Sequence, residues 1–280
     1  MNHFRQKSVQ FIHNHTGLLI ANKLYTRIRK GLGEYIWYVR ARLFGIYYHP
    51  VKYIISSDGK LVYINNPKTA CSTIKLALLR REHPEEAIND DQSVHDLIEP
   101  LTQRKASNIR NDAIIFTFVR NPFERLVSLY LNKFRSMKNI EVEGFYFYNY
   151  LNGIFSQKMS FREFAMTVCK VPDAVADAHF RSQSATVFHN SRLSIDIIGK
   201  LENFQNDWDQ LNRLSGSSMK IEHYNRSAKY DYREFYTQEL VKQVADRYRD
   251  DIKLFGYSNE YHELLEQTAS QAPDGNMAGR

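Results

Sequence analysis

The stretch LVYINNPKTACSTIK, residues 61–75, joins an apolar segment to a proline and then to a run of small hydroxyl residues. Its first four residues predict a β-strand, Pro67 predicts a turn, and Ser72 and Thr73 predict the start of a helix. A helix that begins directly after a tight loop presents free backbone N–H groups and the positive end of its dipole. Lys68 adds a full positive charge. The stretch therefore predicts a loop that binds an anion at the end of a strand.

The segments around this loop predict an α/β fold. Residues 52–64 have the pattern of a β-hairpin with Asp-Gly as its turn, and the apolar run at 114–119 is typical of a strand buried in a parallel sheet. A third strand is expected at 195–199. Because strands and helices alternate, we expect a single P-loop-like domain with a mainly parallel central sheet flanked by helices. The expected helices are 72–82, one that begins at Pro122, 160–170 with a capping box, 203–214 and 237–255.

We place this domain at residues 51–265. Before it, residues 1–50 form a basic, aromatic segment with helical patterns, and after it residues 266–280 are expected to be a flexible tail. Residues 134–157 are rich in Tyr, Phe and Asn and predict a long loop.

The net charge of +7 is concentrated at the N-terminus. Residues 1–50 hold eight basic side chains and one acidic side chain, so the other 230 residues carry 30 of each sign. Two interpretations stay open. The segment is a helical appendage that packs its aromatic rings on the domain, or it is a basic surface for an acidic substrate, membrane headgroups or nucleic acid.

Neither a membrane span nor a disulfide framework is expected. The sequence has no run of about 18 apolar residues, and residues 1–7 lack the features of a secretory signal. Cys71 and Cys169 are too few for a structural zinc set. We expect a cytoplasmic protein without a bound metal, and leave peripheral contact with a membrane open.

The anion loop differs from the phosphate loop of nucleotide kinases. A Walker loop needs Gly-x-x-x-x-Gly-Lys-Ser/Thr, whereas residues 65–73 contain no glycine and place Lys68 early. We find no obvious aspartate at a strand end to hold magnesium. An ATP or GTP enzyme is therefore disfavoured, although loop geometry alone does not separate phosphate transfer from sulfuryl transfer.

A second anion site is predicted where the strand at 114–119 ends. The strand delivers Arg120 to the carboxyl edge of the sheet, where open α/β sheets bind ligands, and Ser128 follows two helical turns later. A guanidinium and a hydroxyl together suit a phosphate. The alternative is that Glu124 and Arg125 are exposed helix residues and that Ser128 has no role in binding.

Both motifs resemble those of the sulfotransferases. Residues 67–73, PKTACST, are similar to the 5′-phosphosulfate loop of that family, and residues 120–128, RNPFERLVS, to its 3′-phosphate motif. The resemblance is closest to the Golgi-type carbohydrate sulfotransferases, which include the chondroitin, dermatan and HNK-1 enzymes. It covers roughly residues 60–257 and includes the blocks at 198–203 and 236–257.

The resemblance implies 3′-phosphoadenosine 5′-phosphosulfate (PAPS) as donor and direct in-line transfer of its sulfuryl group to a saccharide hydroxyl, without a metal. It implies that Lys68 stabilises the charge that develops on the leaving phosphate. Ser72 and Thr73 would then contact the 5′-phosphate, and Arg120 and Ser128 the 3′-phosphate. The implied donor-binding set is Pro67, Lys68, Thr69, Ala70, Cys71, Ser72, Thr73, Arg120 and Ser128.

Two histidines are candidates for the general base that a weakly nucleophilic sugar hydroxyl requires. His95 lies between the two motifs, where related heparan-type enzymes carry their base. His179 matches the family's His-Trp block near the acceptor site. Another residue, a glutamate included, stays open as the base.

The sequence departs from the animal enzymes in two ways. Their His-Trp block is followed by paired cysteines, whereas residues 184–188 contain none, and we find no counterpart of their signal-anchor helix. Both differences suggest a bacterial, cytosolic member of the family. We expect a glycan partner and no nucleic acid, and leave the acceptor and the oligomeric state open. The alternatives are a P-loop-type kinase and a non-catalytic protein that binds anions or a membrane surface.

Overall fold

The computed structural model describes most of the predicted domain. The described residues are 50–84, 94, 96–103, 109–135, 154–156, 158–221 and 230–270. The predicted N-terminal segment and most of the predicted loop at 134–157 lie outside these ranges, as does His95.

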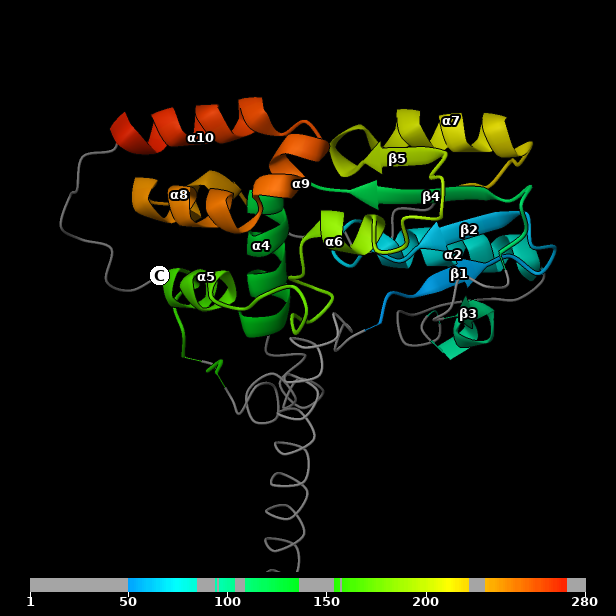
Figure 1. The fold of residues 1–280 in the computed structure, drawn as a ribbon, viewed down its shortest axis with the longest axis horizontal. Coiled ribbons are helices and arrows are strands. Elements are labelled where there is room, and N and C mark those ends of the chain that lie inside the picture. Colours follow the sequence, from blue (N-terminus) through cyan, green and yellow to red (C-terminus); the bar gives the residue numbers. More distant parts are fainter. Residues whose placement is uncertain are drawn as a thin grey trace, which may run out of the picture.

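Within the described residues, the central sheet has five strands in the order β3-β1-β2-β4-β5 (Figure 1). Its parallel part consists of β2 (Leu61–Ile64), β4 (Ile114–Val119) and β5 (Ile197–Lys200). The short strands β1 (Tyr53–Ile55) and β3 (Thr102–Gln103) add an antiparallel edge. The predicted α/β class is confirmed, and both predicted anion motifs follow strands of the parallel part.

The predicted hairpin is confirmed as β1 and β2, which pair antiparallel. Gly59 at its turn has a φ of 71°, a left-handed conformation that glycine adopts without strain. The Ser56 hydroxyl donates to the Asp58 carboxylate at 2.6 Å and closes the turn.

Most helices begin within one residue of the predicted positions. Pro122 occupies the first turn of its helix, and Ser160 and Glu163 form the predicted capping box. The helices are α2 (Cys71–Glu82), α4 (Pro122–Tyr130), α5 (Phe161–Cys169), α6 (Gln183–Val187), α7 (Phe204–Ser215), α8 (Gln238–Arg247), α9 (Arg249–Leu254) and α10 (Ser258–Ser270).

The prediction of one helix over 237–255 is wrong, because Tyr248 divides it into α8 and α9. Tyr248 leaves the helical conformation (φ −112°, ψ 29°), and its buried hydroxyl donates to the Phe180 carbonyl at 2.7 Å. The apolar spacing continues through the break, so the pattern does not reveal it. The helix α10 was not predicted, and it continues to Ser270, past the expected domain boundary at residue 265.

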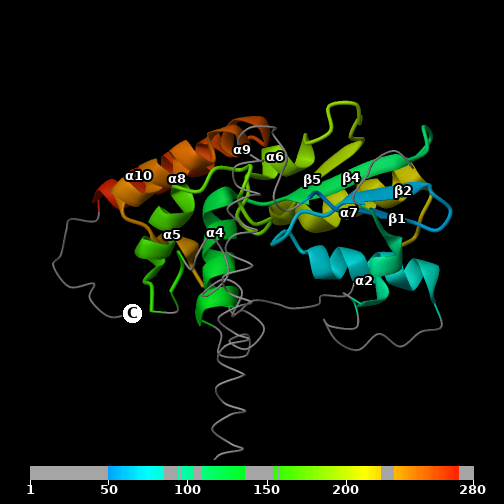
Figure 2. The same ribbon diagram turned by 60° about the horizontal axis from the view of Figure 1, so that its bottom comes forward.

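One face of the sheet is covered by α2 and α7 (Figure 2). The rings of Tyr63 and Phe116 stack on this face with centroids 5.3 Å apart, and the indole of Trp208 meets Phe116 edge-on. Ile74 and Leu78 of α2 are buried in the same cluster. This packing fixes the start of α2 relative to the sheet.

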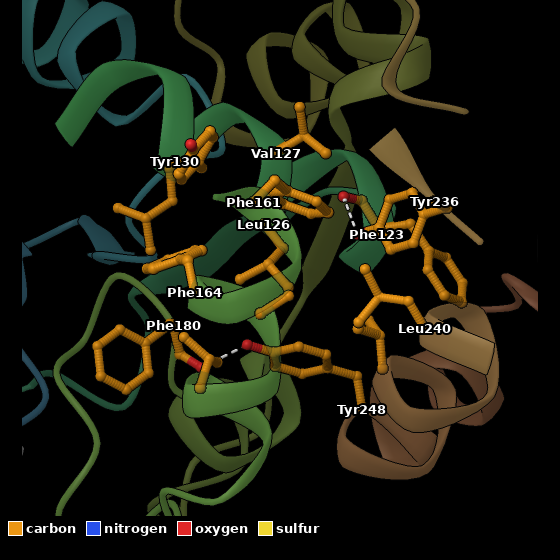
Figure 3. Packing of buried hydrophobic residues seen from close by; sticks show 14 of the residues in the cluster. Phe123, Leu126, Val127, Tyr130, Phe161, Phe164, Phe180, Tyr236, Leu240 and Tyr248 are labelled. Atoms are coloured by element: carbon orange, nitrogen blue, oxygen red, sulfur yellow. Dashed lines mark hydrogen bonds between the residues drawn. The ribbon is translucent and has the colours of Figure 1, made fainter. Parts of the chain in front are cut away.

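The remaining large helices form a second core beside the carboxyl end of β4, where α4, α5, α8, α9 and α10 lie together (Figure 1). Figure 3 shows aromatic rings from α4, α5 and the C-terminal segments converging in this core. Two tyrosine hydroxyls within it find main-chain acceptors: Tyr236 donates to the Phe123 carbonyl at 2.9 Å and Tyr248 to that of Phe180. The second core therefore holds α4, which carries the second anion motif.

Replacing Gly199 by alanine should destabilise the fold. A Cβ there would lie 2.4 Å from the buried ring of Phe118, which packs against Phe204 and Trp208. We expect the free energy of unfolding, measured with urea, to fall by about 1–3 kcal/mol. The control Ser218→Ala, at an exposed position, should change it by less than about 0.5 kcal/mol. An unchanged value for Gly199→Ala would contradict this close packing of β5 on β4.

Candidate functional site

The loop between β2 and α2 has a strained backbone. Lys68 and Ala70 adopt left-handed conformations with φ of 71° and 61°. Such conformations cost a non-glycine residue about 1–3 kcal/mol and cluster at ligand-binding sites. The buried Thr69 hydroxyl donates to the Asn66 carbonyl at 2.7 Å and fastens the loop from inside. Left-handed residues in such loops are typical of backbone anion nests.

The N-terminus of α2 keeps its backbone donors available. Its N-cap is Ala70, and among the described residues no side chain caps it and no acidic residue stands in its first turn. By contrast, α4 and α5 are capped by the side chains of Asn121 and Ser160. The N–H groups at Cys71 and Ser72 therefore lie at the positive end of a twelve-residue helix without a capping acceptor. Ser72 is half-buried and Thr73 buried at this end of the helix.

Four cationic side chains converge beside this helix end. Burial is the main cause that lowers the pKa of Lys68 to about 8, and its positively charged neighbours add to the shift. These neighbours are Lys133, Arg120 and Arg125, whereas Cys71 acts in the opposite direction. Like charges in a partly buried site repel one another until an anion joins them. The positive charges around the predicted loop therefore favour a bound anion, as the backbone N–H groups of the loop do.

Arg120 lies where the sequence predicts it, directly after β4 and next to the loop. Its Nη2 donates to the carboxylate of Glu124 and to the Tyr230 hydroxyl at 3.3 Å, and its Nη1 lies 3.5 Å from the Lys68 carbonyl oxygen. The structure thus brings the two predicted motifs together. Ser128 is buried in α4, about two helical turns after Arg120.

An open cleft of about 520 Å³ adjoins Arg120. Glu124 and Tyr230, which both bind the Arg120 guanidinium, belong to its lining. None of the sequence-based predictions includes this cleft. Its only signal is the alternation of tyrosine with charged residues at 230–233, which resembles many surface segments. The lining residues are Glu124, Tyr230, Asp231, Tyr232 and Arg233.

Arg125 is not an exposed helix residue, which was the alternative considered for the second motif. It is 2% exposed, and each of its three guanidinium nitrogens donates to a main-chain carbonyl. The acceptors are Pro67 (3.1 Å), Arg181 (2.8 Å) and Ala178 (3.0 Å). Arg125 therefore ties α4 to the anion loop and to the segment around His179.

Gln183, which no sequence motif indicates, connects the ends of β2 and β4. Its side-chain amide donates to the Arg120 carbonyl at 2.7 Å, and its Oε1 accepts from the Arg120 N–H at 2.9 Å and from the Asn66 side chain at 3.2 Å. Asp251 holds Gln183 in place, because its buried carboxylate accepts from the N–H groups of Gln183 and Ser184 at the start of α6.

Of the two candidate bases, only His179 lies within the described residues. Its Nδ1 is 2.6 Å from Oδ1 of Asp177, and its main-chain N–H donates to the same oxygen at 2.9 Å. Arg125 binds the carbonyls of Ala178 and Arg181 on either side of it. Arg125 therefore links the turn that carries His179 to the Pro67 carbonyl of the anion loop. His95 lies outside the described residues.

No group of three or more His, Cys, Asp or Glu side chains that could hold a metal ion is found in the described part of the chain. Cys71 and Cys169 are free thiols. None of the described helices is both long and apolar enough to cross a membrane.

Comparisons with known proteins agree with this geometry. A model of the sulfotransferase family matches residues 51–258, which include both anion motifs. The chain is similar to carbohydrate sulfotransferase 11 from Rattus norvegicus, with 25% identity over 235 residues that span 73% of this chain and 66% of the relative. The corresponding proteins from Mus musculus and Danio rerio are each 24% identical over the same shares.

The match therefore spans just under two thirds of the length of these relatives. No solved structure matches the chain. The family model covers most of the chain, with both anion motifs and the sheet that carries them. The chain belongs to the sulfotransferase family.

Proposed function

We propose that this protein transfers a sulfuryl group from PAPS to a hydroxyl of a carbohydrate acceptor. One observation carries the proposal: two cationic anion sites, one on a helix N-terminus and one on an arginine at the next parallel strand, meet at the same edge of the sheet. A donor with phosphates at both its 5′ and 3′ positions fits such a pair. The carbohydrate acceptor is inferred from the names of the similar proteins.

The loop and the start of α2 would hold the 5′-phosphosulfate. The donors for this end of PAPS would be the N–H groups of residues 69–73 and the hydroxyls of Ser72 and Thr73, with Pro67 shaping the loop before them. When bound, PAPS supplies an activated sulfuryl group whose departure leaves negative charge on the 5′-phosphate. The ammonium group of Lys68 would stabilise that charge.

Arg120 and Ser128 would bind the 3′-phosphate. The Arg120 guanidinium donates to the carboxylate of Glu124, which lines the cleft, and such a group also suits a phosphate. The cleft beside it, with the rings of Tyr230 and Tyr232 in its lining, is the proposed place of the nucleoside. A tyrosine ring can stack on a purine base.

The general base is proposed to be His179, whose side chain is part-exposed and whose turn Arg125 links to the loop. His95 stays a second candidate. The cytoplasmic, bacterial setting and a reaction without metal remain predictions. Contact of residues 1–50 with a membrane surface stays open. The kinase and the non-catalytic binding protein are the alternatives that the following experiments separate.

Adenosine 3′,5′-bisphosphate should stabilise the protein more than adenosine 5′-phosphate or ADP does. Only the first carries the 3′-phosphate that Arg120 and Ser128 would bind. At about 100 times its Kd a ligand adds about 2.7 kcal/mol, which thermal denaturation detects as a rise in Tm. Ser128→Ala should reduce the difference between the ligands, and a magnesium chelator should leave it unchanged. Equal shifts from all three nucleotides would exclude the 3′-phosphate site.

The affinity for this bisphosphate should fall as the pH rises above about 8, the pKa of Lys68 in the free protein. A bound phosphate favours the charged ammonium, so the complex holds a proton that the free protein has lost. Because the complex then binds more protons than the free protein, the binding constant decreases with pH. Calorimetric titration should measure this slope, and Lys68→Met should reduce it. The same slope in both proteins would show that Lys68 does not face the phosphate.

Lys68→Ala should lower kcat by about 10²–10³-fold, as expected when one donor to a developing anion is removed. The assay follows transfer of ³⁵S from PAPS to a pool of glycans. The fold should be retained, as circular dichroism can verify, and the matched control Lys242→Ala, exposed on α8, should keep full activity. Unchanged turnover in Lys68→Ala would remove Lys68 from the mechanism.

A further inference from the structure

The carboxylate of Asp177 makes two contacts with His179. One oxygen, Oδ1, lies 2.6 Å from the ring Nδ1 and also accepts the main-chain N–H of His179 at 2.9 Å. The Asp177 side chain is 10% exposed and the His179 side chain 32% exposed. A carboxylate offers only acceptors, so we assign the ring hydrogen of neutral His179 to Nδ1. The other ring nitrogen, Nε2, is then a proton acceptor.

The turn that carries this pair is fixed by main-chain hydrogen bonds. The Asp177 carbonyl accepts the N–H groups of Phe180 at 3.1 Å and Arg181 at 2.8 Å. His179 lies inside this turn. Its ring orientation is therefore set from two sides, by the turn and by the Asp177 carboxylate.

Arg125 connects this turn to the anion loop. Two of its nitrogens bind the carbonyls of Ala178 and Arg181, and the third binds that of Pro67, next to Lys68. Since all three acceptors bind one buried guanidinium, a single side chain holds the turn and the loop together. The loop is the proposed place of the sulfuryl group, so Arg125 ties the turn that carries the pair to the proposed reaction centre.

We propose that Asp177 is the positioning residue for His179 in sulfuryl transfer, and that Arg125 docks both against the loop. This inference rests on the proposed function. The acceptor oxygen forms a bond to sulfur while the bond between sulfur and the bridging phosphate oxygen breaks. The hydroxyl proton passes to Nε2 of His179, and the electron pair of the broken bond leaves with adenosine 3′,5′-bisphosphate. Asp177 holds the ring in the tautomer that accepts this proton and stabilises the imidazolium that forms.

A double-mutant cycle separates this role from a structural one. His179→Gln should lower kcat by about 10²–10⁴-fold, and Asp177→Asn by about 10-fold or more, because Asn keeps an oxygen for the main-chain N–H but loses the charge. The KM for PAPS and the Kd for the bisphosphate should stay within about twofold, since the loop is untouched. The matched control is Asp112→Asn, at an exposed position just before the N-terminal end of β4 and so away from the anion loop.

The decisive variant is Asp177→Asn combined with His179→Gln. If Asp177 acts through His179, the double variant is no slower than His179→Gln alone, because effects of residues that act as a unit are not additive. Independent, multiplied losses would show that Asp177 has a different role and would overturn the inference. Full activity of His179→Gln would overturn it as well.

A readout without turnover keeps the inference testable if the proposed function fails. Nitrogen-15 NMR of histidine distinguishes the two neutral tautomers, and His179→Gln identifies the signal by its loss. We expect the Nδ1–H form in the native protein and a mixed or Nε2–H form in Asp177→Ala. An Nε2–H ring in the native protein would refute the positioning role. Inactivity of the native protein with every glycan, together with equal binding of all three nucleotides, would instead refute the proposed function.

Discussion

The buried guanidinium of Arg125 donates to three main-chain carbonyls. Among the described residues, no carboxylate accepts a hydrogen bond from it. Neutral acceptors satisfy its hydrogen bonds but leave its charge in place. That charge contributes to the low pKa of Lys68, so the contact that joins the loop, α4 and the His179 turn also strengthens the field that an anion meets. Rigidity and electrostatics at this site therefore have a common source.

The two arginines of the second motif have different surroundings and different roles. Arg120 ends β4 at the cleft, and its charge is matched by the carboxylate of Glu124. Arg125, five residues later, points from α4 into the protein. The difference follows from the turn between strand and helix, because Pro122 starts α4 there and the helix then rotates successive side chains to different sides.

The strain and charge repulsion at the site depend on stable packing elsewhere. The left-handed residues Lys68 and Ala70 lie between β2, buried in the sheet, and α2, whose Ile74 and Leu78 pack on the sheet. On the other side, the aromatic core around α4 holds Arg125. Two well-packed cores thus meet at the carboxyl edge of the parallel strands, and the anion site occupies the junction.

The sequence by itself determined the hairpin, the two parallel strands with their anion motifs and most helix starts, because hydrophobic periods, Pro122, the Asp-Gly turn and the capping box are local signals. It also put Lys68 and Arg120 at the ends of adjacent parallel strands, where the structure brings them together, while their roles and that of Ser128 remain predictions. It did not reveal the contacts of Arg125, Gln183 and Asp177 or the cleft at 230–233. It also predicted one continuous helix across the break at Tyr248. Each of these depends on a partner about 50 or more residues away or on the orientation of a side chain within a turn. Only the tertiary structure decided them, because hydrogen bonds between distant segments leave no periodicity in the chain.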